Sequence, residues 1–233
     1  MLRPDVLLCL GEEKQEFDRA LDLAGFERAT ETHRHRTFTA ELRDEVLCVD
    51  GGLSSAIVET SLWELLRPGT VGKIILVGTA GTLPGFTQTS GVPYVMDPAE
   101  SVYQAFDAPP GATWSPTLNV DLPKALCISS DRFYGFSSQS DGPYPAEPGL
   151  LEAWNRNKGR DGLVDMEAAA FYHHWEAFAG GDLQYAAVKV PANPVSNLDA
   201  LPEASAEAVE AAGHHIDHEA VPGDAQSRRR RRA

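Results

Sequence analysis

The chain has 233 residues, of which 42% are hydrophobic and 23% charged, a composition typical of a globular α/β protein with a single domain. Its formal net charge is -14, and without the arginine run at 228–232 the other 15 basic residues face 34 acidic ones. Because so acidic a body repels nucleic acid and anionic membranes, we expect neither as a partner.

Apolar runs of strand length alternate with helical patterns in the first third of the chain. The predicted elements are a buried strand over 5–10, a polar helix ending near Gly25, an exposed strand over 37–42, its hairpin partner over 45–49 and a helix over 53–66. A central strand over 73–77 follows, and we expect it to stop at a glycine-rich turn over 78–82.

The rest of the chain continues this alternation without a second domain. The segment 84–123 is rich in Gly, Pro, Asp and Ser, and it is predicted to form hairpins and loops around a pocket. Strands are predicted over 124–129 and 184–190, and helices over 150–157 and 203–212. We therefore expect one α/β domain over 1–220 and a disordered arginine-rich tail over 221–233.

Cysteine usage and apolar run length indicate the compartment. Cys9, Cys48 and Cys127 are odd in number, far apart and set in apolar runs, which argues against a disulfide framework and against a zinc site. No apolar run reaches the roughly 18 residues of a membrane-spanning helix, and the first residues show no signal-peptide pattern. We expect a cytoplasmic protein that needs no metal or other cofactor.

The stretch GLVDMEAAAFY, from Gly162 to Tyr172, joins carboxylates to an alanine-rich run. Ala, Met and Glu favour a helix, and Asp165 and Glu167 in its first turn would suit the positive end of the helix dipole. Short alanines would let the helix pack tightly on a sheet, with Glu167 facing the strand ends. The alternative is that both carboxylates are ordinary first-turn acids.

Two glycine-rich stretches follow strand patterns, one at Gly51 and Gly52 and the other at 78–82. Backbone N–H groups in such turns can bind an anion or a sugar hydroxyl. The alternative is that the glycines only let the chain turn.

These segments together resemble the nucleoside phosphorylase and nucleosidase superfamily. The resemblance rests on VGTAG at 77–81, SSDRFYG at 129–135, VDMEAAAF at 164–171 and VPANP at 190–194, and it covers about Val6 to Asn197. It implies a single three-layer α/β domain whose central mixed sheet is partly closed into a barrel, assembled as a homo-oligomer. The implied activity is cleavage of the N-glycosidic bond of a purine nucleoside, by water or by phosphate.

Such a cleavage leaves an oxocarbenium-like sugar, so the enzyme must hold the ribose, assist the departing base and aim a nucleophile. By resemblance, Glu167 would accept hydrogen bonds from the ribose hydroxyls, with Met166 against the sugar face. Phe133 would stack on the base, and the backbone near Tyr134 would meet the base edge.

The resemblance also places the nucleophile and the base contact. Thr79, with the amides of Ala80 and Gly81, would hold phosphate or the nucleophilic water, and Gly52 would line the substrate site. Asn193 would contact the base.

The base preference depends on Asn193. Family nucleosidases that act on adenine carry Ser-Asp where this chain has Ala192 and Asn193. An asparagine cannot protonate purine N7, although its amide can hydrogen-bond there. Members that take 6-oxopurines, including the trimeric purine nucleoside phosphorylases and futalosine hydrolases, use asparagine in this neighbourhood. We predict a 6-oxopurine preference; the alternative is an adenine-type methylthioadenosine/S-adenosylhomocysteine nucleosidase.

Phosphate lacks an assigned cation. Hexameric phosphorylases carry an arginine three residues before the Ser or Thr of their glycine-rich motif, and here that position is Leu76. Phosphate would depend on Arg34, Arg36, Arg43 or Lys73. Because a buried dianion without a cation is costly, water is favoured as the nucleophile, and phosphorolysis stays the alternative.

A hydrolase needs a base for its water. By resemblance this is Glu13, or Glu12 or Glu16 if the first strand ends elsewhere, unless all three are solvated helix-start acids. A relative that binds a nucleoside without cleaving it is the competing functional class.

Overall fold

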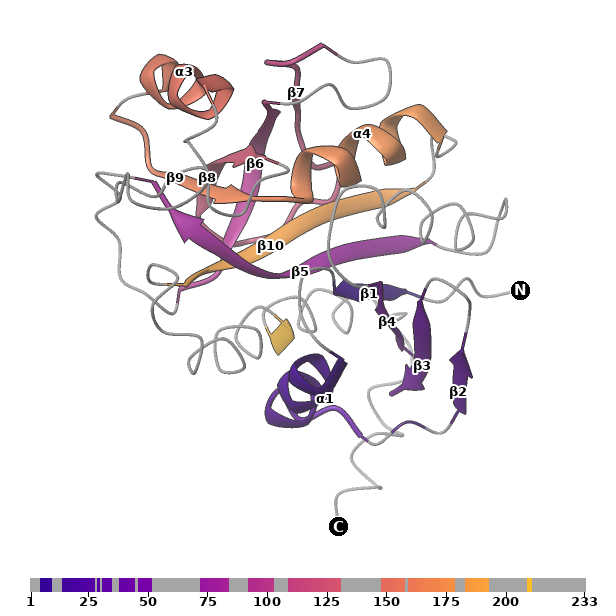
Figure 1. Cartoon of the computed structure of the whole chain (residues 1–233). Coiled ribbons are helices and arrows are strands. Elements are labelled where there is room, and N and C mark those ends of the chain that lie inside the picture. The colour runs from indigo at the N-terminus through magenta and orange to yellow at the C-terminus, as the bar shows by residue number, and fades with distance from the viewer. Residues whose placement is uncertain are drawn as a thin grey trace.

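The computed structural model describes residues 5–9, 14–27, 29, 31–34, 38–44, 46–51, 72–83, 92–102, 109–130, 148–157, 159–178, 183–192 and 209–210. The elements in chain order are β1 (Val6–Cys9), α1 (Lys14–Leu23), β2 (Glu31–Arg34), β3 (Thr39–Arg43), β4 (Val46–Asp50), β5 (Lys73–Thr82), β6 (Tyr94–Ser101), β7 (Thr113–Trp114), β8 (Lys124–Ser129), α3 (Pro148–Arg156), β9 (Gly162–Asp165), α4 (Ala168–Phe178) and β10 (Gln184–Ala192). Figure 1 shows α3 and α4 on one side of the long strands β5 and β10, and α1 on the other.

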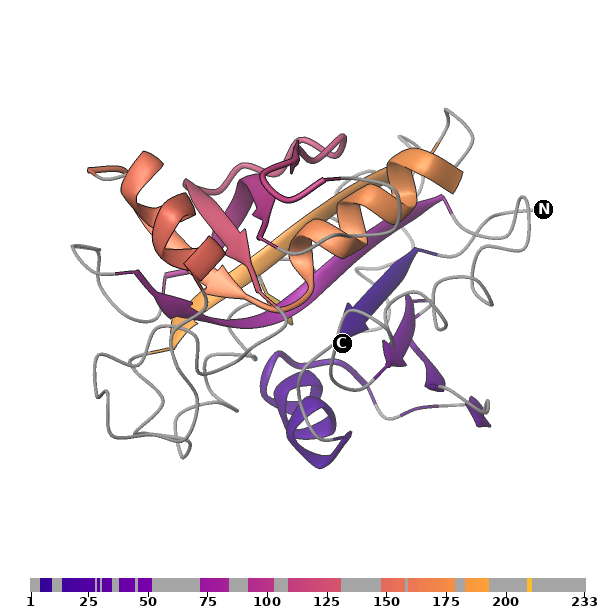
Figure 2. The ribbon, with the colours of Figure 1, turned by 45° about the horizontal axis from the view of Figure 1, so that its top comes forward.

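Strand β5 organises a mixed sheet whose order is β10-β6-β8-β9-β5-β1-β4-β3-β2. It pairs in parallel with β1 and with β10, and antiparallel with β9. Since β10 also pairs with β6, which continues through β8 to β9, the strands β5, β10, β6, β8 and β9 close into a barrel. The predicted fold class, an α/β domain with a mixed sheet partly closed into a barrel, is confirmed. Figure 2 shows β1 to β4, in indigo to purple, extending beyond the barrel, to which β1 is joined through its pairing with β5.

The glycine-rich end of β5 corrects one prediction. Residues 78–82 were expected to form a turn, but they continue the strand, and β10 pairs with it in register as far as Gly81. Ladder hydrogen bonds here outweigh the weak strand preference of glycine. A Cβ at Gly81 would lie 3.1 Å from Cγ1 of Val164, so the close approach of β9 favours glycine at this position.

The prediction that 84–123 forms hairpins and loops is also wrong in part, because this segment contains the eight-residue strand β6. Its register against β8 shifts between Met96 and Ala99, and Pro98 falls in that irregularity. Bulges accommodate proline within a sheet, and they also hide the alternation by which a strand is recognised.

Two short strands complete the corrections. Residues 162–165 form β9 rather than the beginning of a helix, because they pair with β8 and β5. Strand β3 was expected to be exposed but is largely buried; the exposed edge strand is β2, which was not predicted. Charged edge residues such as Glu31 and Arg34 discourage pairing with another chain.

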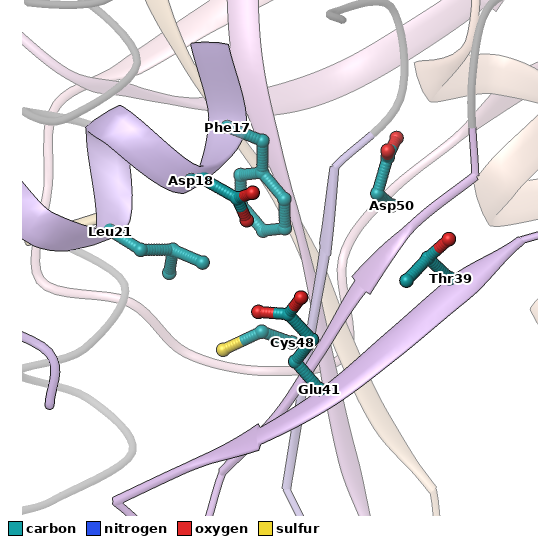
Figure 3. A pocket seen from close by; sticks show the side chains of 7 residues that line it. All are labelled: Phe17, Asp18, Leu21, Thr39, Glu41, Cys48 and Asp50. Atoms are coloured by element: carbon teal, nitrogen blue, oxygen red, sulfur yellow. The ribbon is translucent and has the colours of Figure 1, made fainter. Parts of the chain in front are cut away.

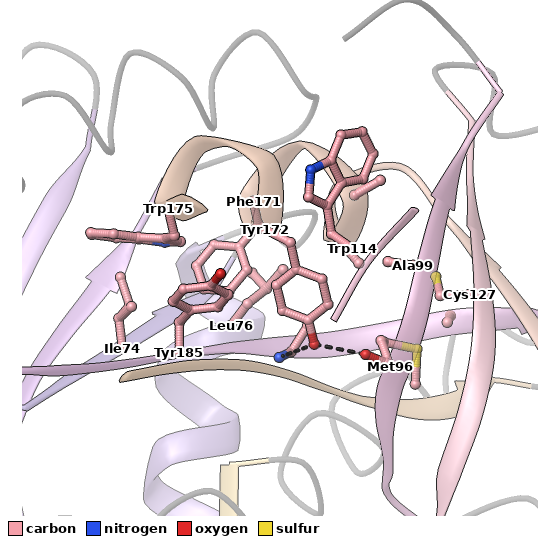
Figure 4. Close-up of a cluster of buried hydrophobic side chains, with 14 of the residues drawn as sticks. Ile74, Leu76, Met96, Ala99, Trp114, Cys127, Phe171, Tyr172, Trp175 and Tyr185 are labelled. Atoms are coloured by element: carbon pink, nitrogen blue, oxygen red, sulfur yellow. Dashed lines mark hydrogen bonds between the residues drawn. The ribbon is translucent and has the colours of Figure 1, made fainter. Parts of the chain in front are cut away.

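Helix α4 packs its aromatic residues on the barrel strands, as Figure 4 shows for Phe171, Tyr172 and Trp175. The hydroxyl of Tyr172 donates to the carbonyl of Met96 at 2.8 Å and accepts from the N–H of Ala187 at 2.9 Å. The β10–β6 register, Val188 opposite Val95, would next place Ala187 opposite Met96. The Tyr172 hydroxyl therefore bridges β6 and β10 at the bulge, in place of a direct backbone hydrogen bond between Met96 and Ala187.

Substitution of Tyr172 by phenylalanine is expected to lower the free energy of unfolding by about 2 kcal/mol, because two buried backbone groups lose their partner. Urea denaturation would measure the change. Tyr185→Phe is the matched control, since the hydroxyl of Tyr185 has no hydrogen-bond partner in the described part of the chain; an equal loss in both variants would contradict the bridging role.

Cys48 and Cys127 are buried free thiols. None of the described helices is long and apolar enough to cross a membrane.

Candidate functional site

The sheet splits at the glycine-rich end of β5. Strand β10 occupies one edge of β5 along its length, while the other edge pairs with β1 up to Val77 and with β9 from Gly81. Between them, Thr79 and Ala80 face no strand on that edge among the described residues. Thr79, at this split, is half-buried.

Asp165 ends β9 beside this split and is 7% exposed. Its Oδ1 accepts hydrogen bonds from the Ser129 hydroxyl at 2.6 Å and the Cys127 thiol at 3.2 Å. Its Oδ2 accepts from the N–H of Ala168 at 3.0 Å, so Asp165 caps α4. The Ser129 oxygen in turn accepts from the N–H of Ala169 at 2.9 Å. One buried carboxylate thus links the end of β9 to the first turn of α4.

Glu167 and Lys189 lie beside Asp165 and are buried as well. Lys189 Nζ is 3.4 Å from Oδ2 of Asp165 and 3.4 Å from Oε2 of Glu167. The N–H of Met166 also donates to Oε2 of Glu167, at 3.4 Å. Two carboxylates around one ammonium, all ionised, give this buried cluster a net charge of one negative unit.

The register of β10 places this cluster at the split of the sheet. Lys189 lies opposite Gly78 of β5, one residue before Thr79. The glycine-rich end of β5 and the carboxylates of the β9–α4 junction, predicted separately, therefore belong to one region.

Burial raises the pKa of Glu167 from its ordinary value to about 7; the nearby Lys189 opposes this shift and Asp165 adds to it. A carboxylate with such a pKa is close to its midpoint of ionisation at neutral pH. Shifts of this kind, caused by burial and specific charged neighbours, are typical of functional sites.

Lys189 is the functional residue that the sequence reading missed. It stands in the run Tyr-Ala-Ala-Val-Lys-Val-Pro-Ala of the last strand, where its neighbours on both sides are apolar. A lysine is almost never buried without a partner, so one in a buried strand predicts a carboxylate opposite. That signal was present in the sequence.

The structure describes five of the ten predicted site residues, in two segments that meet where Gly81 of β5 pairs with Val164 of β9: Glu167, Met166, Thr79, Ala80 and Gly81. The predicted helix start is wrong in detail, because α4 begins at Ala168 and Asp165 belongs to β9. Five predicted residues lie outside the described ones, namely Glu13, Gly52, Phe133, Tyr134 and Asn193, as do Glu12 and the side chain of Glu16.

The basic residues considered for phosphate lie elsewhere. Arg43 is buried in ion pairs with Asp18, Asp22 and Glu41. Lys73 begins β5, at the opposite end from Thr79. Arg34 is on the exposed strand β2, and Arg36 lies outside the described residues. Among the described basic side chains, Lys189 is the one that lies at the site.

A small hollow lies between α1 and the β3–β4 hairpin, away from this cluster (Figure 3). It is lined by Phe17, Asp18, Leu21, Thr39, Glu41, Cys48 and Asp50. Burial alone would lower the pKa of Arg43, but hydrogen bonds to Glu41 and Asp22 raise it, so the guanidinium keeps its charge. We regard the hollow as a packing gap beside an ion-pair cluster, because two of its three carboxylates, Asp18 and Glu41, already pair with Arg43.

No family model matches the sequence, and no curated protein matches it either. Solved structures do match the fold. Futalosine hydrolase of Helicobacter pylori aligns over 93% of this chain and 98% of its own, at 14% sequence identity and a TM-score of 0.65. S-adenosylhomocysteine nucleosidase of Streptococcus pyogenes aligns over 95% and 99%, at 14% identity and a TM-score of 0.69.

A 5′-methylthioadenosine/S-adenosylhomocysteine nucleosidase of Colwellia psychrerythraea, solved in complex with adenine, aligns over 92% of this chain and 95% of its own. The identity is 14% and the TM-score 0.68. The predicted resemblance is confirmed at the level of fold: the chain folds as these nucleosidases do.

Proposed function

We propose that this protein cleaves the N-glycosidic bond of a purine nucleoside, with water as the nucleophile. The observation that carries the proposal is the buried cluster of Glu167, Lys189 and Asp165 at the split of the sheet. The fold adds support, since the matched proteins include a futalosine hydrolase and 5′-methylthioadenosine/S-adenosylhomocysteine nucleosidases, one solved with adenine and another with butyl-thio-DADMe-Immucillin-A.

Glu167 suits the ribose end of such a substrate. Both of its contacts in the described part of the chain end on Oε2, so Oε1 is available to accept hydrogen bonds from ribose hydroxyls. As the bond to the base breaks, the sugar becomes cationic, and a cluster that carries net negative charge stabilises that state more than the neutral substrate. Met166, half-buried beside Glu167, is our candidate for packing against the sugar.

Water rather than phosphate is supported by the charges at the site. Lys189 is already shared by two carboxylates, and a phosphate dianion would add negative charge beside a cluster that is negative overall. A buried dianion without a paired cation is strongly disfavoured. Thr79 and Ala80, on the open edge of β5, are our candidates for holding the water.

The base class has two candidates. Asn193 predicts a 6-oxopurine, whereas the methylthioadenosine/S-adenosylhomocysteine nucleosidases among the matches favour an adenine-type substrate. In the sequence, Asn193 directly follows Ala192, the last residue of β10. Assembly as a homo-oligomer, which the resemblance implies, remains a prediction that light scattering can test.

The direct test is release of free base. Purified protein is given paired 6-oxo and 6-amino purine nucleosides, with and without a 5′-methylthio group, in buffers with and without phosphate, and products are separated by chromatography. Base release that does not depend on phosphate is the expected result. Release only with phosphate would make the protein a phosphorylase, and binding without release would favour the non-catalytic alternative.

Activity is expected to fall below a pH of about 7. Because burial raises the pKa of Glu167 to about 7, this carboxyl is protonated below that pH and loses the negative charge that stabilises the sugar cation. A profile of kcat/KM from about pH 4 to about pH 9 would show the acid limb. A limb near the ordinary glutamate value of about 4.5 would contradict the assignment.

A further inference from the structure

The carboxylate of Asp165 has more partners than a helix cap requires. The N–H of Ala168 alone satisfies the capping role, yet Ser129, Cys127 and Lys189 also contact this carboxylate. These extra partners come from β8 and β10, on both sides of the site. They fix the carboxylate in one orientation.

Ser129 sets that orientation. Its oxygen accepts from the N–H of Ala169, so its single hydroxyl proton points to Oδ1 of Asp165 at 2.6 Å. With Oδ1 held by the serine and Oδ2 held by the helix N–H, the carboxylate cannot rotate without breaking buried hydrogen bonds.

The second observation is the position of the ammonium. Lys189 Nζ is 3.4 Å from a carboxylate oxygen of Asp165 and equally 3.4 Å from one of Glu167. If Glu167 were its only partner, the buried ammonium of Lys189 would form a closer ion pair with Glu167 and neutralise its charge. Shared between two carboxylates, the ammonium orients Glu167 through Oε2 and leaves the cluster negative.

We propose that Asp165, clamped by Ser129, is a positioning residue for the glycosidic cleavage proposed above, and that it keeps Lys189 from neutralising Glu167. This inference rests on the proposed function. Asp165 acts through Lys189 and touches no reacting atom.

Among the described residues, the other titratable groups on the elements around the cluster leave its charge unchanged. From β8, the thiol of Cys127 has a pKa that burial raises well above its ordinary value, so it stays neutral. From α4, burial likewise raises the pKa of Tyr172 well above its ordinary value, and burial lowers that of His174 to about 4. His173 lies on the same helix, nearly two turns from Glu167. Residues 74–82 of β5 include no titratable side chain.

Asp165→Asn is the decisive variant, because it keeps the shape and an acceptor for the helix N–H but removes the charge. Lys189 should then pair with Glu167 alone, so that Glu167 ionises at a pH lower by about one unit or more. We expect kcat to fall by about tenfold or more, with KM changed by less than about threefold, because the lost negative charge acts mainly on the cationic transition state.

Two readouts separate this inference from the proposed function. The first is the titration of Glu167 followed by carboxyl-¹³C NMR in glutamate-labelled protein, with the resonance assigned by its absence in Glu167→Gln. It needs no substrate. The second is kcat and KM for whichever nucleoside the wild-type protein cleaves.

Asp97→Asn is the matched control, since Asp97 pairs with Lys124 at 2.8 Å, away from the cluster. It should leave both readouts at wild-type values. If Asp165→Asn does not fold, Asp165→Ser keeps an N-cap acceptor while removing the same charge.

A lower titration midpoint in the Asp165 variant, with the control unchanged, is the expected result. A folded variant with the wild-type midpoint, or a kcat within twofold of wild type, would overturn the positioning role. Failure of the wild-type protein to release base from any nucleoside would instead overturn the proposed function, while the titration would still decide whether Asp165 controls Glu167.

Discussion

Replacement of Glu167 by glutamine is expected to lower kcat by about 10² or more while the fold is retained. The carboxylate should bind the ribose hydroxyls more strongly as the sugar becomes cationic, and glutamine offers no charge for that step. Loss of one such preorganised interaction costs about 3 kcal/mol in comparable sites. Turnover kinetics with the nucleoside identified by base release would measure the effect.

Stability separates this role from a structural one. Because the pKa of Glu167 is raised in the folded protein, its contribution to folding is present below about pH 4.5 and is lost as the pH rises through about 7. Glutamine resembles the protonated form, so the variant should be at least as stable as wild type at about pH 8. Low activity without lost stability is therefore the expected combination.

Glu41→Gln serves as the control for this substitution. Glu41 is also a buried glutamate with a cationic partner, Arg43, but it lies on β3 outside the cluster. Its replacement should leave kcat within a few fold of wild type. Normal turnover of Glu167→Gln would remove this residue from the mechanism.

The barrel shows which parts of the fold the sequence could predict. The first half of β5, over 73–77, and strand β8 are continuous, largely buried apolar runs, and their hydrophobicity alone predicts them. Strand β6 was missed because a bulge and Pro98 interrupt its pattern. Strand β9 is four residues long and leads directly into helix-forming residues, so only its pairing with β8 and β5 reveals it.

The candidate site also has parts that the sequence predicts and parts that only the structure reveals. Glu167 and the glycine-rich end of β5 could be predicted from local sequence and resemblance. Asp165 was singled out with Glu167 as a helix-start acid, but neither its bond to Ser129 nor the position of Lys189 could be predicted, because both depend on the long-range pairings of β9 and β10. The closed sheet, rather than any single motif, brings the charged groups together.

Substitution of Lys189 by methionine is expected to destabilise the protein by about 3 to 5 kcal/mol at about pH 8. The substitution leaves two buried carboxylates without their shared cation, and removal of one partner from a buried ion pair costs about this much. Urea denaturation would measure the free energy of unfolding. Lys124→Met is the control, because Lys124 forms a largely exposed pair with Asp97 that should contribute about 1 kcal/mol or less.

The loss should depend on pH in a defined direction. Lys189 lowers the pKa of Glu167, so without it that pKa rises further above about 7. A carboxyl with a raised pKa contributes stability below its unfolded value, about 4.5, and loses it as the pH rises through the folded value. In the variant the folded-state pKa of Glu167 is higher, so ionisation of Glu167 removes more of the free energy of unfolding. The difference in this free energy between wild type and variant should therefore grow as the pH rises above about 7. A deficit that is equal at about pH 5.5 and about pH 8.5, or no larger than that of Lys124→Met, would show that Lys189 does not neutralise this cluster.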